Sequence, residues 1–219
     1  LKNKKVGLVT GPIQKSNIIE GGFKTFQGHT EWIQKRTKSR NVVMLLSAKN
    51  IKVALATTHI PLTEVVKNIR KAKLVKTIQT LHSGLKTKFK IKHPSITVLG
   101  LNPHAGENGK IGTEEIKKIN PAVEVCRDMG INVSYAISAD TAFTDKKLKQ
   151  TDAYLAMYHD QALPVLKALS FGEAVNITLG TGIIRTSVDH GTALDIAGKM
   201  KPNLGSIKEA IKAAEVQLQ

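Results

Sequence analysis

The sequence predicts an α/β fold in which helices cover a largely parallel sheet. Short segments rich in Val, Ile and Leu alternate with longer amphipathic stretches. Several of these segments are apolar at nearly every position, as is typical of strands that are covered on both faces. Strand–helix alternation favours parallel pairing through crossover helices. The expected strands span residues 5–10, 41–47, 51–57, 95–101, 131–137, 153–158 and 174–179.

Helices are expected over residues 61–81, 112–130 and 205–218. Pro61 is placed near the first turn of the first helix, where a missing N–H costs little. Pro121 is expected to bend the second helix, and Gly130 to stop it. Ser206 is a candidate N-cap for the third helix.

Size and composition indicate a protein with a substantial core in a reducing compartment. The 219 residues are 41% hydrophobic, and they contain one cysteine, Cys126. One cysteine excludes an intrachain disulfide, so a cytoplasmic location is the simplest inference. No apolar run reaches the roughly 20 residues that a membrane-spanning helix needs.

The net charge of +16 raises the question of a polyanionic partner. The densest basic run covers residues 67–93, where apolar residues recur at helical spacing and the lysines fall between them. No aromatic residues interleave with these lysines to stack bases. We therefore interpret the run as the solvated side of a helix. Steering of an anionic substrate and nucleic-acid binding are the less favoured alternatives.

Three histidines follow predicted strands directly: His59, His104 and His159. Ligand-binding groups gather at the carboxyl ends of strands in open α/β sheets. One histidine in such a place is most simply a structural residue. Three at equivalent places favour a shared divalent metal, because imidazole is the commonest protein metal ligand.

Further polar residues are expected at the same edge. His29 and Thr30 lie in a Gly-containing loop, and Asp140 follows the segment 131–137. Lys167 and Arg185 are candidates to bind an anionic group, with a turn or surface role as the alternative. The chain has no Walker A sequence and no GxGxxG fingerprint, so the residues that bind a cofactor stay unassigned.

The segments "LVTGPI", "GHTEW", "VALATTHIPL", "GLNPHAGENGKIGTEE", "MYHDQALPVLK" and "VNITLGTGIIRTSVDHGTALDIAG" resemble the 4-hydroxythreonine-4-phosphate dehydrogenase family of vitamin B6 biosynthesis. The resemblance implies two α/β/α lobes around a cleft, as in isocitrate and isopropylmalate dehydrogenases, and a homodimer. It also implies that residues 1–219 correspond to the C-terminal two-thirds of this two-lobed catalytic unit. The family's N-terminal third, with its "GDPAGIGPE"-like segment, has no counterpart in the sequence.

The resemblance assigns a role to each candidate residue. It implies that His59, His104 and His159 bind one divalent metal ion (Zn, Mg or Co), with ligands from both chains of the dimer. It implies that the phosphorylated substrate is bound by His29, Thr30, Lys167, Asn176 and Arg185. Asp140 matches a carboxylate near the metal, and Asp160 follows the third histidine. The general base is one of Asp140, Asp160 and Lys167.

The implied reaction is oxidation of 4-phosphooxy-L-threonine with NAD, or alternatively NADP. The product then loses CO2 and gives 3-amino-2-oxopropyl phosphate, a step in pyridoxal phosphate biosynthesis. Two alternatives stay open, the first of them because close relatives in the family oxidise such substrates. The protein oxidises another phosphorylated hydroxy acid, such as a four-carbon sugar-acid phosphate, or it is a non-catalytic homologue that binds phosphate.

Overall fold

The computed structural model describes residues 6–170, 172–199 and 201–219, and in this part the strands form one seven-stranded sheet. The order across the sheet is β1-β7-β6-β2-β3-β5-β4. The strands are β1 (Gly7–Thr10), β2 (Val43–Ala48), β3 (Ile51–Leu55), β4 (Ile96–Val98), β5 (Ala153–Ala156), β6 (Val175–Leu179) and β7 (Ile184–Val188).

The two ends of the sheet are parallel and its centre is antiparallel. β3, β5 and β4 pair in parallel at one end, and β1 and β7 do so at the other. The pairs β2–β3, β2–β6 and β6–β7 are antiparallel. The short connections between β2 and β3 and between β6 and β7 dictate two of these three pairings, because a parallel crossover needs a dozen or more residues. The expected α/β class is confirmed.

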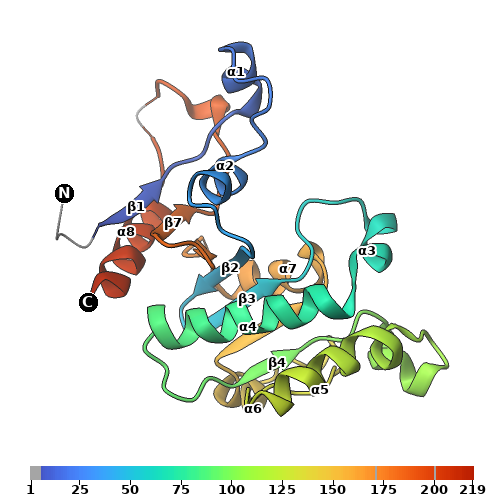
Figure 1. Ribbon diagram of the computed structural model, residues 1–219. Helices are drawn as coiled ribbons and strands as arrows, with labels where there is room; N and C mark the ends of the chain where they lie inside the picture. The colour runs from blue at the N-terminus through green and yellow to red at the C-terminus, as the bar shows by residue number, and fades with distance from the viewer. Residues whose placement is uncertain (1–5, 171, 200) are drawn as a thin grey trace.

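Helices cover both faces of the sheet (Figure 1). One buried cluster joins one face of the sheet to α4, α5 and α8, and a second joins the other face to α7. Along β3, Val53 and Leu55 belong to the second cluster and Ala54 to the first, as strand alternation requires. The α-helices are α1 (Lys15–Glu20), α2 (His29–Arg36), α3 (Leu62–Asn68), α4 (Lys71–Lys88), α5 (Asn120–Asp128), α6 (Asp145–Gln150), α7 (His159–Ser170) and α8 (Gly205–Leu218).

Two expected helices have different boundaries in the structure. The helix expected over 61–81 is broken between α3 and α4 at Ile69, whose backbone is extended and whose side chain is buried. The expected bend at Pro121 lies just before it, in a π-helical turn, Glu115–Ile119, which leads into α5. Gly130 does follow the helix end, with φ of 79°.

Three local expectations were wrong. Segment 131–137 is no strand, because it makes only isolated bridges, Ile96 with Val133 and Leu99 with Ile137. Strand β7 was missed. Ser206 is not the N-cap of α8, which is Leu204. Its hydroxyl instead accepts a hydrogen bond from the Asp189 N–H at 3.2 Å.

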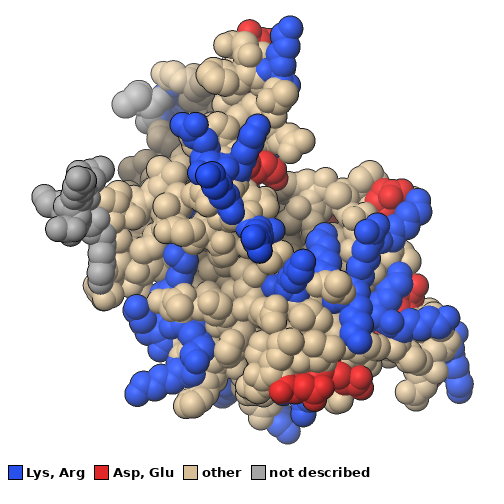
Figure 2. Space-filling view, in the orientation of Figure 1, with Lys and Arg blue, Asp and Glu red and all other residues tan. Residues whose placement is uncertain are grey.

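Most of the basic residues lie on the surface. Figure 2 shows Lys and Arg side chains spread over much of one face of the molecule. In α4, Leu74, Ile78, Leu81 and Leu85 are buried, and the lysines of the helix are mostly exposed. This is the solvated helix side expected from the sequence. No helix in the described ranges is long and apolar enough to cross a membrane.

Candidate functional site

The ends of β3 and β5 bring two of the three histidines together. Beyond the strands, the Thr57 N–H and hydroxyl both donate to the Met157 carbonyl oxygen, at 3.2 and 2.7 Å. The two chain segments therefore leave the sheet side by side. The His59 and His159 rings follow, with their centroids 5.5 Å apart. Thr58, His59, Tyr158, His159 and Asp160 line one surface cavity of about 310 Å³.

The tripeptide His159–Asp160–Gln161 forms the first turn of α7; the first two side chains pair with each other, and the third contacts the backbone of two strand ends. His159 Nδ1 and Asp160 Oδ1 are 2.6 Å apart, so the carboxylate can orient the imidazole. Gln161 Oε1 accepts from the Met157 N–H at 2.7 Å, and its amide group donates to the Gly100 carbonyl oxygen. The tripeptide thus joins a candidate ligand to the ends of two strands.

His104 lines a different cavity, of about 600 Å³, which neither His59 nor His159 lines. Asp140, Tyr158, Asp160 and Gln161 also line this cavity. The Ser138 hydroxyl donates to Asp140 and holds the pKa of that carboxyl below its ordinary value, and the nearby His104 acts in the same direction. Asp140 is therefore a carboxylate at neutral pH.

The candidate metal ligands form an incomplete set in one chain. Among the described residues, no three His, Cys, Asp or Glu side chains converge as a metal site. His59 and His159 make a suitable pair of donors, because burial, and then the charge of His159, lower the pKa of His59 and keep it neutral. Two imidazoles beside a carboxylate suit a divalent metal ion that needs further ligands.

Four of the predicted substrate residues do come together. His29, Thr30, Asn176 and Arg185 line one cavity of about 420 Å³, and His59 lines it too. They come from the first turn of α2, from β6 and from β7. The positive end of a helix dipole and a guanidinium therefore share this cavity, which suits an anion.

Arg185 is nearly fully buried, at 4% exposure. Its guanidinium donates to the hydroxyls of Thr178 at 3.0 Å, Thr10 at 2.9 Å and Thr30 at 3.4 Å. Its Nε has no hydrogen-bond partner among the described residues. Burial lowers the pKa of Arg185, and the charge of Glu31 opposes that shift. A buried cation held by neutral hydroxyls keeps its charge available for an anionic ligand.

Lys167 does not line the cavity that contains Arg185. Its ammonium is 3.1 Å from the Asp189 carboxylate, and its side chain is half exposed. The ion pair joins α7 to the segment that follows β7. Lys167 is thus occupied by Asp189 in this structure.

The sequence analysis assigned no role to three ionisable residues that line the Arg185 cavity: Lys15, Glu31 and His190. No pattern distinguished Lys15 from a surface charge, and Glu31 lies in the segment "GHTEW", where the resemblance gave a role only to His29 and Thr30. His190 was visible in a Gly-rich segment beside Arg185, but nothing in that segment indicated its direction.

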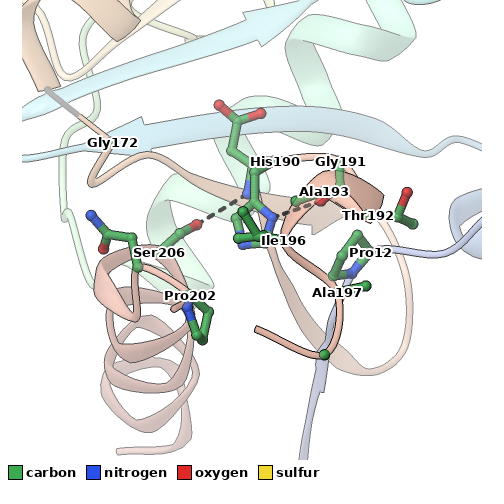
Figure 3. Close-up of a pocket in the computed structure, with 13 residues that line it drawn as sticks. Pro12, Gly172, His190, Gly191, Thr192, Ala193, Ile196, Ala197, Pro202 and Ser206 are labelled. Carbon is green, nitrogen blue, oxygen red and sulfur yellow. Dashed lines mark hydrogen bonds between the residues drawn. The ribbon is translucent and has the colours of Figure 1, made fainter. Parts of the chain in front are cut away.

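A larger cavity of about 780 Å³ adjoins the Arg185 cavity, and Pro12 and His190 line both. Figure 3 shows its wall, which comes from Pro12, from the segment after His190 and from Ser206 at the start of α8. The wall is built largely of glycine, alanine, proline and backbone groups. Such a wall can accept a flat, mostly uncharged part of a cofactor.

Comparison with known proteins gives a consistent result. The family model described as "Pyridoxal phosphate biosynthetic protein PdxA" matches residues 1–214. A 4-hydroxythreonine-4-phosphate dehydrogenase of Enterobacter sp. (strain 638) is 52% identical over 214 residues, which are 98% of this chain and 65% of the relative. The chain therefore spans about two thirds of that relative's length.

Solved structures agree in fold. A crystal structure of 4-hydroxythreonine-4-phosphate dehydrogenase from Klebsiella pneumoniae superposes with a TM-score of 0.89 at 36% identity, covering 97% of this chain and 65% of that one. Isocitrate dehydrogenase from Methylococcus capsulatus superposes with a TM-score of 0.53 at 14% identity, covering 94% of this chain and 67% of that one. The second match concerns the fold alone, and it confirms the expected architecture.

Proposed function

Because the chain belongs to the PdxA family of pyridoxal phosphate biosynthetic proteins, we propose that the protein oxidises 4-phosphooxy-L-threonine with NAD. Loss of CO2 then gives 3-amino-2-oxopropyl phosphate. The proposal includes a divalent metal ion at the histidines and a homodimer as the active form. We also propose a cytoplasmic location, because the sequence has a single cysteine, Cys126, and therefore no intrachain disulfide.

The observation that carries the proposal is the position of His59. Its side chain lines the cavity that contains Arg185 and also the cavity that contains His159. A substrate with its phosphate at Arg185 would therefore extend toward a pair of imidazoles. This juxtaposition suits a phosphorylated molecule whose hydroxyl must lie at a metal ion.

The separate position of His104 supports a site completed by a second chain. His59 and His159 form one half of the proposed ligand set, and His104 with Asp140 forms the other. We propose that each metal site combines the first half from one chain with the second half from its partner. A cyclic dimer would then contain two such sites.

The protein's own groups have distinct roles in this proposal. Arg185 and the first turn of α2 bind the phosphate, and Asn176 in the same cavity orients the substrate. Asp160 holds the His159 imidazole through Nδ1. A bound metal ion would supply Lewis acidity at the substrate hydroxyl, and the nicotinamide would accept hydride.

Asp140 is our proposal for the base that takes the hydroxyl proton, because the other two candidates are already paired. Asp160 is engaged with His159, and Lys167 with Asp189. We propose that the large cavity beside Pro12 and His190 receives the nicotinamide cofactor, since it opens next to the phosphate cavity. Lys167 would reach the substrate only by leaving Asp189.

An NAD reduction assay on the full-length protein tests the proposal. The panel contains 4-phosphooxy-L-threonine and four-carbon sugar-acid phosphates, each with Zn²⁺, Mg²⁺ or Co²⁺. We expect turnover with the threonine derivative and release of CO2. Preference for a sugar-acid phosphate would replace the substrate in our proposal. Phosphate binding without any turnover would identify a non-catalytic homologue.

A further inference from the structure

Glu115 is a buried acidic residue that the proposed reaction does not use. Its side chain is 2% exposed, and no cation pairs with it among the described residues. Its Oε1 accepts the backbone N–H groups of Leu101 at 2.7 Å and Asn102 at 2.8 Å. Its Oε2 accepts from the Asn102 side-chain amide at 2.9 Å. Backbone amides thus take the place of a counter-ion.

The chain wraps closely around this carboxylate. Residues 104–108 all have positive φ, and His104 itself has φ of 51°. Such a run of left-handed residues is strained and persists only where the surroundings fix it. A Cβ at Gly106 would lie 2.6 Å from Glu115 Oε2, so the loop can approach the carboxylate this closely only with glycine at position 106. The conformation of the His104 loop is therefore tied to Glu115.

Gln161 holds the same stretch of backbone from the opposite side. Its amide group donates to the Gly100 carbonyl oxygen, next to the two N–H groups that Glu115 accepts. Its Oε1 accepts from Met157, two residues before His159. The Glu115 carboxylate thus fixes the N–H groups of segment 100–102, and the Gln161 amide fixes a carbonyl oxygen of the same segment. Gln161 also ties this segment to the start of α7.

We propose that Glu115 and Gln161 are positioning residues that fix segment 100–102 and thereby aim His104 at the metal ion. This inference rests on the proposed metal site, to which His104 contributes. Neither side chain touches the metal ion or the substrate in this account. Residues that orient a metal ligand typically change metal affinity 10- to 100-fold when they are substituted.

The first test compares Co²⁺ affinity in the full-length protein, measured by competition with a chromophoric chelator. Glu115→Gln keeps the size of the side chain but presents an amide where Oε2 accepts from Asn102. We expect it to weaken Co²⁺ binding about tenfold. Glu107→Gln is the matched control, because it removes one exposed carboxylate from the same loop. An equal loss of Co²⁺ affinity in both variants would mean that the negative charge of the loop attracts the metal ion without any positioning of His104. That result would overturn the proposal.

A double-mutant cycle separates positioning from general stability. With His104→Ala in the background, Glu115→Gln should weaken Co²⁺ binding no further, because the ligand that it aims is gone. The same loss in both backgrounds would contradict the proposal. Gln161→Met is the second variant. It should also weaken Co²⁺ binding in the wild-type background and not in the His104→Ala background, so the proposal can still be tested if Glu115→Gln fails to fold.

A readout without metal distinguishes failure of this inference from failure of the proposed function. If the wild-type protein binds no Co²⁺, the proposed metal site is wrong, and the positioning is then judged from the imidazole NMR signals of His104. Glu115→Gln should shift or broaden these signals, while Glu107→Gln should leave them largely in place. Unchanged His104 signals in Glu115→Gln would overturn the proposal.

Discussion

The Arg185 cavity and the His104 loop differ in how many functional side chains a single chain brings together in each. Around Arg185, side chains from β1, α2, β6 and β7 converge, and three threonine hydroxyls hold the guanidinium. Among the residues that the structure describes, no other histidine lines the cavity of His104, although the backbone that carries it is firmly held. One region is an assembled cluster of polar side chains around a buried cation, and the other carries a histidine for which we propose a ligand role across the dimer.

The difference follows from how each region is built. Arg185 belongs to a strand, so the neighbouring strands and the helix that packs near them fix its surroundings. His104 belongs to a loop whose path is set by a buried carboxylate rather than by the sheet. We expect substitutions in the first region to act within one chain, and substitutions at His104 to act across a dimer.

The largest expected effect is at the histidine pair. His159→Ala removes a proposed ligand and should weaken metal binding by more than about 100-fold, beyond the effect of a residue that only orients a ligand. Isothermal titration with Zn²⁺ or Co²⁺ measures the loss. The thermal midpoint of the metal-free protein should change little, because His159 is partly exposed.

His29→Ala is the matched control for that experiment, since His29 lies in the Arg185 cavity and outside the proposed ligand set. It should retain near-normal metal affinity while it loses phosphate affinity. Wild-type metal affinity in His159→Ala would show that His159 is not a metal ligand, and would contradict the contrast between the two histidines.

Mixing two inactive variants tests whether the His104 region acts across the dimer. A heterodimer of His104→Ala and His159→Ala chains contains one site with all three histidines and one site that lacks two. With random exchange, half of the dimers are heterodimers, so about one quarter of the wild-type activity should return. Mass spectrometry verifies the exchange. No recovery in verified heterodimers would place all ligands in a single chain.

Arg185→Lys tests the assembled region. Lysine keeps the charge but loses the planar fork that contacts three hydroxyls, so we expect phosphate or substrate affinity to fall about tenfold. Because Arg185 ties Thr10, Thr30 and Thr178 together, we also expect a lower thermal midpoint. Arg36→Lys, at an exposed arginine over Trp32, is the control and should change neither quantity. Unchanged phosphate affinity in Arg185→Lys would make Arg185 a structural residue.

The sequence predicted those parts of the fold that rest on apolar periodicity. Strands such as Val43–Ala48 are nearly all apolar and were found. Strand Ile184–Val188 was missed, because it contains Arg, Thr and Ser, whose burial depends on partners from distant segments. The break at Ile69 was missed because the apolar spacing continues across it while the backbone becomes extended.

For the site, the strand-end rule predicted the meeting of His59 with His159, which parallel pairing of β3 and β5 produces. It did not predict the separation of His104, since spacing says nothing about a left-handed loop. Glu115 reads in the sequence as an ordinary acid near a helix start. Only the tertiary structure shows that backbone amides surround it. Whether the three histidines share one metal ion stays a prediction.

The smallest expected effect concerns the protonation of His29. Burial, and then the charge of Arg185, lower the pKa of His29 below its ordinary 6.5. Its imidazole is therefore neutral in the folded protein at pH values where the unfolded chain already binds a proton. The contribution of His29 to stability is fully present above pH 6.5 and is lost as the pH falls through the lower pKa of the folded state.

An anion in the Arg185 cavity should reverse this preference, because a negative charge beside His29 favours imidazolium and raises its pKa. Sulfate is the suitable probe, since its own charge is constant between pH 5.5 and 7.5. We expect sulfate to bind a few-fold more tightly at the lower pH, and His29→Gln to reduce that gain. His59 lines the same cavity and its pKa is also lowered by burial, so part of the gain should remain. His82→Gln is the control, because burial and Lys86 lower the pKa of His82 on α4, away from this cavity. Equal pH dependence in wild type and His29→Gln would show that His29 keeps its neutral form beside the anion.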